Sequence, residues 1–116
     1  MNTVSKNFQK YVNEYIRKYG WDFNSNGGSL EPYIALKYSG EKVFAYIDYE
    51  RNIIHIPDLK EKESLKTVSY NFKDKNRLLK QWKCAQIIEV NITNEVLFPD
   101  YIKLLELACK KINNRT

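Results

Sequence analysis

The stretch of sequence that decides the fold is YIALKYSGEKVFAYIDYERNIIHI, residues 33–56. Two turn-forming pairs, Ser39-Gly40 and Arg51-Asn52, divide this apolar-rich run into three segments. The turns leave three apolar-rich segments of strand length. We therefore expect a three-stranded antiparallel meander, with strands over residues 30–38, 42–50 and 53–56.

The middle strand of this meander is expected to present different side chains to the two faces of the sheet, because successive strand residues point in opposite directions. One face would carry Val43, Ala45, Ile47 and Tyr49, and the other would carry Phe44, Tyr46, Asp48 and Glu50. Aromatic rings therefore fall on both faces, although a sheet covered by helices on one side requires them on that side only.

The clearest helix of the sequence covers residues 4–19. Its apolar residues recur at spacings of three and four and form one stripe: Val4, Phe8, Tyr11, Val12, Tyr15, Ile16 and Tyr19. Thr3 or Ser5 is expected to cap its start, and Gly20 is expected to end it in the left-handed conformation. Residues 22–29, rich in Gly, Asn and Ser, predict a loop.

The second half of the chain predicts two further strands, over residues 66–72 and 85–92. A short helix capped by Asp74 is expected over residues 74–83, and a last helix begins at Pro99. The intervening residues, from 58 to 66, are interpreted as a mixed-charge linker or a short exposed helix.

These elements predict an α+β fold in a single domain, residues 1–116. We expect a two-layer sandwich in which a mostly antiparallel sheet of about five strands is covered by the N- and C-terminal helices. No apolar run is long enough to cross a membrane, and the first residues do not resemble a signal peptide, so we expect a cytoplasmic protein without a membrane partner. Cys84 and Cys109 are expected to be buried thiols, although their spacing leaves a disulfide open.

The sequence contains no familiar catalytic or metal-binding pattern. His55 is the only histidine, and Cys84 and Cys109 are far apart, so a zinc ion has no ligand set. No nucleophile elbow and no glycine-rich phosphate loop occurs. We therefore expect a protein that is not an enzyme and holds no metal or cofactor. A weaker alternative is a metal-dependent hydrolase whose carboxylates would have to converge on one pocket, using Asp48, Glu50 and Asp58.

Positive charge is concentrated in residues 73–83, KDKNRLLKQWK, which we call the basic stretch. Lys75, Arg77, Lys80 and Lys83 are expected on the exposed side of a short helix, and together with Lys73 they are the candidate nucleic-acid-binding residues. Such a surface can neutralise nucleic-acid phosphates. The opposing interpretation is a simply solvated surface, because the net charge of +5 comes mainly from lysines that A/T-rich codons favour. Arginine, which suits bidentate phosphate contacts better, occurs only at four positions.

Tyrosine is unusually frequent, with nine residues, and many of them fall on predicted strands. Strand tyrosines that lie outside the core would form an amphipathic surface of the kind enriched at protein interfaces. We expect such a docking surface around Tyr33, Tyr38, Phe44 and Tyr46. The hypothesis from sequence is a small accessory or inhibitor-type binding domain, encoded by a phage or mobile element, that docks on a protein partner or on a second copy. Nucleic-acid binding through the basic stretch is the alternative.

Overall fold

The computed structural model describes residues 2–25, 34–38, 42–60 and 62–113. The helices in these residues are α1 (Thr3–Tyr19), α2 (Asn76–Trp82) and α3 (Phe98–Asn113), with the 3₁₀ helices η1 (Glu63–Leu65) and η2 (Glu95–Leu97). The strands are β1 (Trp21–Ser25), β2 (Ile34–Tyr38), β3 (Val43–Asp48), β4 (Ile53–Pro57), β5 (Ser69–Lys73) and β6 (Ile87–Asn91). None of the helices within this described part combines the length and the apolar character needed to cross a membrane.

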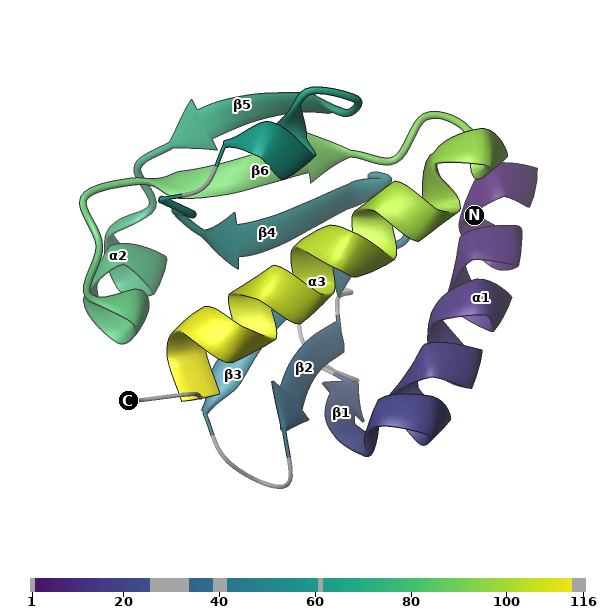
Figure 1. Ribbon diagram of the computed structural model, residues 1–116, viewed down its shortest axis with the longest axis horizontal. Coiled ribbons are helices and arrows are strands. Elements are labelled where there is room, and N and C mark those ends of the chain that lie inside the picture. The colour runs from purple at the N-terminus through teal and green to yellow at the C-terminus, as the bar shows by residue number, and fades with distance from the viewer. Residues whose placement is uncertain (1, 26–33, 39–41, 61, 114–116) are drawn as a thin grey trace.

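The six strands form one antiparallel sheet in the order β1-β2-β3-β4-β6-β5 (Figure 1). The first four strands follow one another as a meander. β6 then pairs with β4, and β5 pairs only with β6, so β5 is an edge strand. The predicted α+β fold with helices at both termini is confirmed, and the sheet has six strands instead of about five.

The additional strand, β1, includes residues that the sequence analysis interpreted as a loop. That prediction was wrong for residues 22–25, while residues 26–29 lie outside the described part of the chain. Trp21 opens the strand with only 6% of its surface exposed, and its ring lies 5.1 Å from that of Phe44. Pairing with β2 along the whole strand, together with burial of Trp21, therefore outweighs the local preference of Asn and Ser for turns.

Helix α1 buries its predicted stripe, but its cap differs from the prediction. The side chain of Asn2 accepts a hydrogen bond from the backbone N–H of Ser5 at 2.8 Å, so the expected caps, Thr3 or Ser5, were wrong. Ser5 is instead fully buried, and its hydroxyl donates to the side chain of Asn52 in the turn between β3 and β4. The helix ends at Gly20 with φ 69°, which confirms the predicted left-handed terminus.

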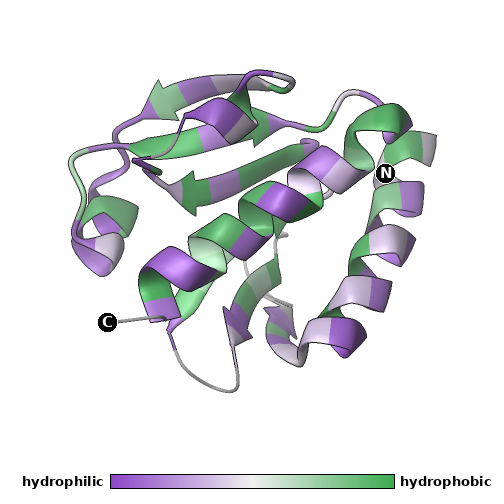
Figure 2. Ribbon diagram, in the orientation of Figure 1, coloured by the Kyte–Doolittle hydropathy of each residue, from purple (hydrophilic) through white to green (hydrophobic). Residues whose placement is uncertain are grey.

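Helix α3 crosses one face of the sheet, and α1 runs beside it near β1 (Figure 1). We call the covered side the helix face and the opposite side the open face. Hydrophobic and hydrophilic residues alternate along β4 and β6 in Figure 2. The buried residues of the central strands that point to the helix face are Leu36, Ala45, Ile47, Ile54, Ile56, Ile88 and Val90.

Strand β3 departs from simple alternation at Phe44. Leu36 of β2 pairs with Ala45, but the next residue of β2 pairs with Val43, so Phe44 has no partner in the register. Phe44 is completely buried. The expectation that it shares a face with Tyr46 was therefore wrong, because this irregularity turns its ring into the core.

The short helix α2 covers one end of the open face. Because Tyr46 alternates with the buried Ala45 and Ile47, its side chain points away from the helix face. The ring of Trp82 in α2 lies 5.9 Å from the Tyr46 ring. The Trp82 indole N–H also donates to the carbonyl of Val43 at 2.9 Å. Both faces of β3 are thus packed at this end of the sheet.

Candidate functional site

The open face carries a row of polar side chains on neighbouring strands. The register aligns Tyr46 of β3, His55 of β4, Glu89 of β6 and Asn71 of β5. Residues directly opposite each other in antiparallel strands have Cβ atoms about 5 Å apart, so their side chains can interact. Lys73 lies two residues beyond Asn71 on β5, and the row therefore adjoins the basic stretch.

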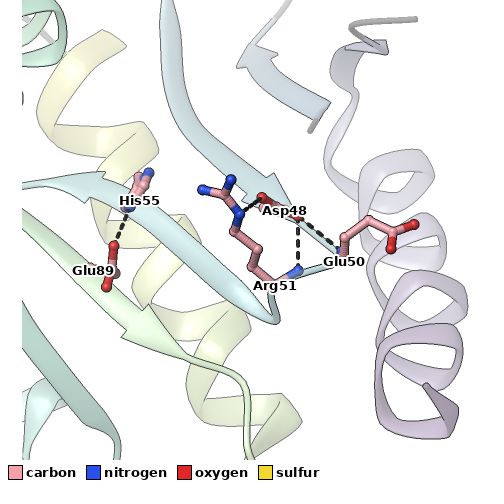
Figure 3. A network of polar contacts seen from close by, with 5 residues as sticks. All are labelled: Asp48, Glu50, Arg51, His55 and Glu89. Carbon is pink, nitrogen blue, oxygen red and sulfur yellow. Dashed lines mark hydrogen bonds and ion pairs between the residues drawn. The ribbon is translucent and has the colours of Figure 1, made fainter. Parts of the chain in front are cut away.

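His55 and Glu89 form a polar pair within this row (Figure 3). Nε2 of His55 lies 2.8 Å from Oε2 of Glu89, and the two side chains are only 11% and 17% exposed. Burial lowers the pKa of His55, and the positive charge of Lys75 acts in the same direction, while Glu89 and Asp48 oppose the shift. His55 is therefore neutral at pH 7 and donates its Nε2 proton to the Glu89 carboxylate.

A histidine held by a carboxylate can act as a general base only if a reacting group lies within reach. The side-chain contact of His55 is with Glu89, which is a carboxylate and not a reacting group that His55 could deprotonate. The described residues also contain no group of three His, Cys, Asp or Glu side chains arranged to hold a metal ion. The geometry of this pair fits a structural link between β4 and β6.

The carboxylates of the hydrolase alternative do not converge. Asp48 accepts hydrogen bonds from the backbone N–H groups of Glu50 and Arg51, at 2.9 and 3.0 Å, and so closes the turn after β3 (Figure 3). Asp58 follows the other end of β4 and binds the ammonium group of Lys62 at 2.6 Å. The length of β4 therefore separates the two aspartates.

The four residues expected to form an aromatic docking surface are not brought together. Tyr33 lies outside the described residues. Tyr38 is 43% exposed, Phe44 is fully buried, and Tyr46 is half-buried beside α2. The Tyr46 hydroxyl donates to the side chain of Gln81 at 3.1 Å. The middle of the open face, at His55, Glu89 and Asn71, is therefore polar, which the aromatic content of β3 did not indicate.

An exposed aromatic pair lies instead at the β1 edge of the sheet. Phe23 is 51% exposed and is opposite Leu36, while Tyr38 is opposite Trp21. Phe23 and Tyr38 are thus diagonal neighbours on one face, close enough for aromatic side chains to meet. Phe23 was not predicted from the sequence as a surface residue of the sheet, because the residues around it predict a loop.

All five cations predicted as a nucleic-acid surface are exposed: Lys73, Lys75, Arg77, Lys80 and Lys83. They begin at Lys73, the last residue of β5, and continue along α2 to its C-terminal cap position, Lys83. Helix α2 begins at Asn76, and its N-terminal cap position is Lys75, so the prediction of Asp74 as the cap was wrong. This shorter helix keeps Leu78 and Trp82 buried and leaves its charged side chains in solvent.

The lysines of the basic stretch differ from those of the preceding charged segment, residues 58–66. In that segment, Lys62 pairs with Asp58 at 2.6 Å. Lys66 likewise pairs with Glu63 at 3.1 Å. Considering only described residues, four lysines of the basic stretch have no carboxylate partner: Lys73, Lys75, Lys80 and Lys83.

The two cysteines, Cys84 and Cys109, are free thiols. Both are half-buried, whereas the sequence predicted buried thiols. Burial raises the pKa of the Cys109 thiol, partly offset by hydrogen bonds from Asn113 and Trp21. A thiol in this state is a weak nucleophile.

Comparison of the chain with protein-family models, with curated proteins and with solved structures found no match. The candidate surfaces are therefore defined by geometry and charge alone.

Proposed function

We propose that this protein is a non-catalytic binding domain that docks on nucleic acid through the basic stretch. The observation that carries the proposal is the exposure of four lysines that have no carboxylate partner in the described residues. The stretch contains five cations and one carboxylate, Asp74, and so has a net charge of +4. Cations without internal partners can neutralise phosphates without first breaking an ion pair.

The expected contacts are to phosphates and not to bases. Trp82 is the aromatic residue of the basic stretch, but it is 5% exposed and cannot serve as a stacking platform. Arg77 is the one arginine of the stretch, and it lies on a helix of seven residues. Bidentate reading of guanine usually depends on arginine or lysine that a longer element presents in the major groove. Binding should therefore depend strongly on salt and only weakly on base sequence.

The direct test is the affinity for a fluorescein-labelled DNA duplex, measured by anisotropy at several salt concentrations. With four phosphate contacts, the logarithm of the binding constant should fall with the logarithm of salt concentration with a slope of about −3.6. Absence of a complex with duplex DNA, duplex RNA and single strands at low salt would show that the proposal is wrong.

A matched pair of double variants separates the basic stretch from overall charge. The Lys80→Gln/Lys83→Gln variant and the Lys62→Gln/Lys66→Gln variant each remove two positive charges from the same net charge of +5. The first should reduce the salt slope by about 1.8, since two phosphate contacts are lost. The second should leave the slope unchanged, because those lysines already have carboxylate partners. Equal losses in both variants would contradict a role of the basic stretch.

A protein partner is the second candidate, and the exposed pair Phe23 and Tyr38 favours it. Aromatic side chains of this kind are enriched at the centres of protein interfaces. In a pull-down, a specific partner should be retained by the parent protein and lost with Phe23→Ser/Tyr38→Ser. A Phe72→Ser variant, which changes an exposed ring at the opposite edge of the sheet, should still retain it.

A further inference from the structure

Strand β5 forms an edge of the sheet that no other described element covers (Figure 1). It pairs only with β6, and four of its five residues are exposed, Tyr70 being half-buried. An edge strand presents unpaired backbone N–H and C=O groups that can pair with another strand. The outer side of β5 is therefore open to strand addition.

β5 has few of the usual features that prevent such pairing. It contains no proline, its register with β6 is uninterrupted from Ser69 to Lys73, and Lys73 at its end is its one charged residue. Phe72 is 42% exposed and packs edge-to-face on Tyr70, with the ring centroids 5.6 Å apart. The Lys62 ammonium group lies 5.1 Å from the centre of the Phe72 ring. Tyr70 and Phe72 therefore form an aromatic pair on the edge strand β5.

We propose that the outer edge of β5 pairs with β5 of a second copy, antiparallel, about a two-fold axis at Asn71. The sequence SYNFK is self-complementary in this register. Tyr70 would lie opposite the partner's Phe72, which forms two aromatic cross-strand pairs on the helix-face side. Asn71 would lie opposite its own counterpart, where two side-chain amides can exchange hydrogen bonds. The charges are also compatible, because Lys73 would face the partner's Ser69.

The two-fold axis would stand perpendicular to the sheet, so the two open faces would point to the same side. Both basic stretches would then be presented to one side of a continuous sheet. The pairing is independent of the proposed nucleic-acid function, since it depends only on the β5 edge. One pair of five-residue strands makes a small interface, so the association should be reversible and concentration-dependent.

Sedimentation equilibrium tests the association. The average mass of the parent protein should rise from 13.8 kDa towards twice that value with increasing concentration. Phe72→Lys should keep the protein monomeric, whereas Phe23→Lys, at a ring that is 51% exposed on the other edge strand, should not. A parent protein that stays monomeric up to about 1 mM would overturn the proposal. Loss of the dimer through Phe23→Lys but not through Phe72→Lys would overturn it as well.

Disulfide trapping tests the register. Directly opposed residues of antiparallel strands have Cα atoms about 4.5–5.5 Å apart, within the range that a disulfide bridges. Asn71→Cys should therefore give a covalent dimer under mild oxidation. Ser69→Cys is the control, because its counterpart would lie about 13 Å away along the strand. The parent protein, with its half-buried Cys84 and Cys109, measures the background. Cross-linking of Asn71→Cys no faster than that of Ser69→Cys would overturn the proposed axis.

Discussion

The two faces of the sheet serve different purposes, although the same strands build both. The helix face is filled by side chains that are completely buried beneath α3, including Phe44, Ile47 and Ile56. The open face carries hydrogen-bonded polar side chains, represented by the His55–Glu89 pair, and adjoins the exposed basic stretch. We therefore expect stability to depend mainly on the helix face, and the proposed nucleic-acid contacts to lie on the side of the open face.

The largest effect is expected from Phe44. The irregular register at this residue directs its side chain into the core instead of to the open face. Phe44→Ala should lower the free energy of unfolding by about 3–5 kcal/mol, because it removes a fully buried ring and leaves a cavity. Tyr46→Ala, two residues along the same strand, removes a half-buried ring and should cost only about 1 kcal/mol. Urea denaturation measures both values. Similar costs for the two variants would contradict the assignment of faces.

The assignment of faces is also where prediction from sequence reached its limit. Strict alternation correctly placed Ala45, Ile47 and the buried Tyr49 on one side of β3. It failed at Phe44 because an unpaired residue shifts the register, and nothing in the sequence of β3 alone marks that position.

The C-terminal end of α1 and the turn after β3 were predicted correctly, since their signals are local, while the predicted turn at Ser39-Gly40 lies outside the described residues. Gly20 marks the end of α1, and Asn52 adopts a positive φ of 59° in the predicted turn at Arg51-Asn52. β1 was missed because its stability comes from pairing with β2 and from the contact between Trp21 and Phe44, which are distant in the sequence.

The candidate surfaces also differ in how far they could be predicted from the sequence. The exposure of the basic stretch follows from local composition and was predicted. The predicted aromatic docking surface is not seen at Tyr46 because α2 packs on this residue through Trp82. This contact joins residues far apart in the chain. The pairing of the lysines follows local composition as well. Residues 58–66 contain three carboxylates, and Lys62 and Lys66 pair with Asp58 and Glu63 three or four residues away, whereas the basic stretch contains only Asp74.

A second test removes the partner of His55 on the open face. Glu89→Ala should lower the free energy of unfolding by about 1–3 kcal/mol, because the largely buried ring N–H loses its acceptor. Asn71→Ala, at the exposed end of the same row, should change stability by less than about 0.5 kcal/mol. Urea denaturation at pH 7.5 compares the two. An equal effect would mean that the pair does not link β4 to β6.

The pH dependence of stability provides a second test of the buried His55. His55 has a lowered pKa in the folded protein, because of burial and the charge of Lys75, against the opposing effects of Glu89 and Asp48. As the pH falls below about 6.5, the unfolded chain binds a proton at His55 before the folded protein does, so stability declines. The decline ends once the pH is below the lowered pKa of the folded state. His55→Gln should therefore lose less stability than the parent protein over this range, and an unchanged profile would argue against a neutral, buried His55.

The smallest effect on stability is expected at the end of α2. A single substitution there, at Lys83, should change DNA binding and the free energy of unfolding in different directions or to different extents. Lys83 adopts the left-handed conformation, with φ 52° and ψ 52°, which costs an L-residue about 1–2 kcal/mol relative to the right-handed helix. Glycine avoids that cost, although it loses about 0.5–1 kcal/mol through greater freedom in the unfolded chain. Lys83→Gly should therefore leave the free energy of unfolding unchanged or raise it by up to about 1.5 kcal/mol. The same variant should weaken DNA binding, since one exposed cation of the basic stretch is lost. Thermal denaturation and anisotropy on the same sample measure the two effects, and a loss of stability parallel to the loss of binding would mean that Lys83 acts through the fold and not through its charge.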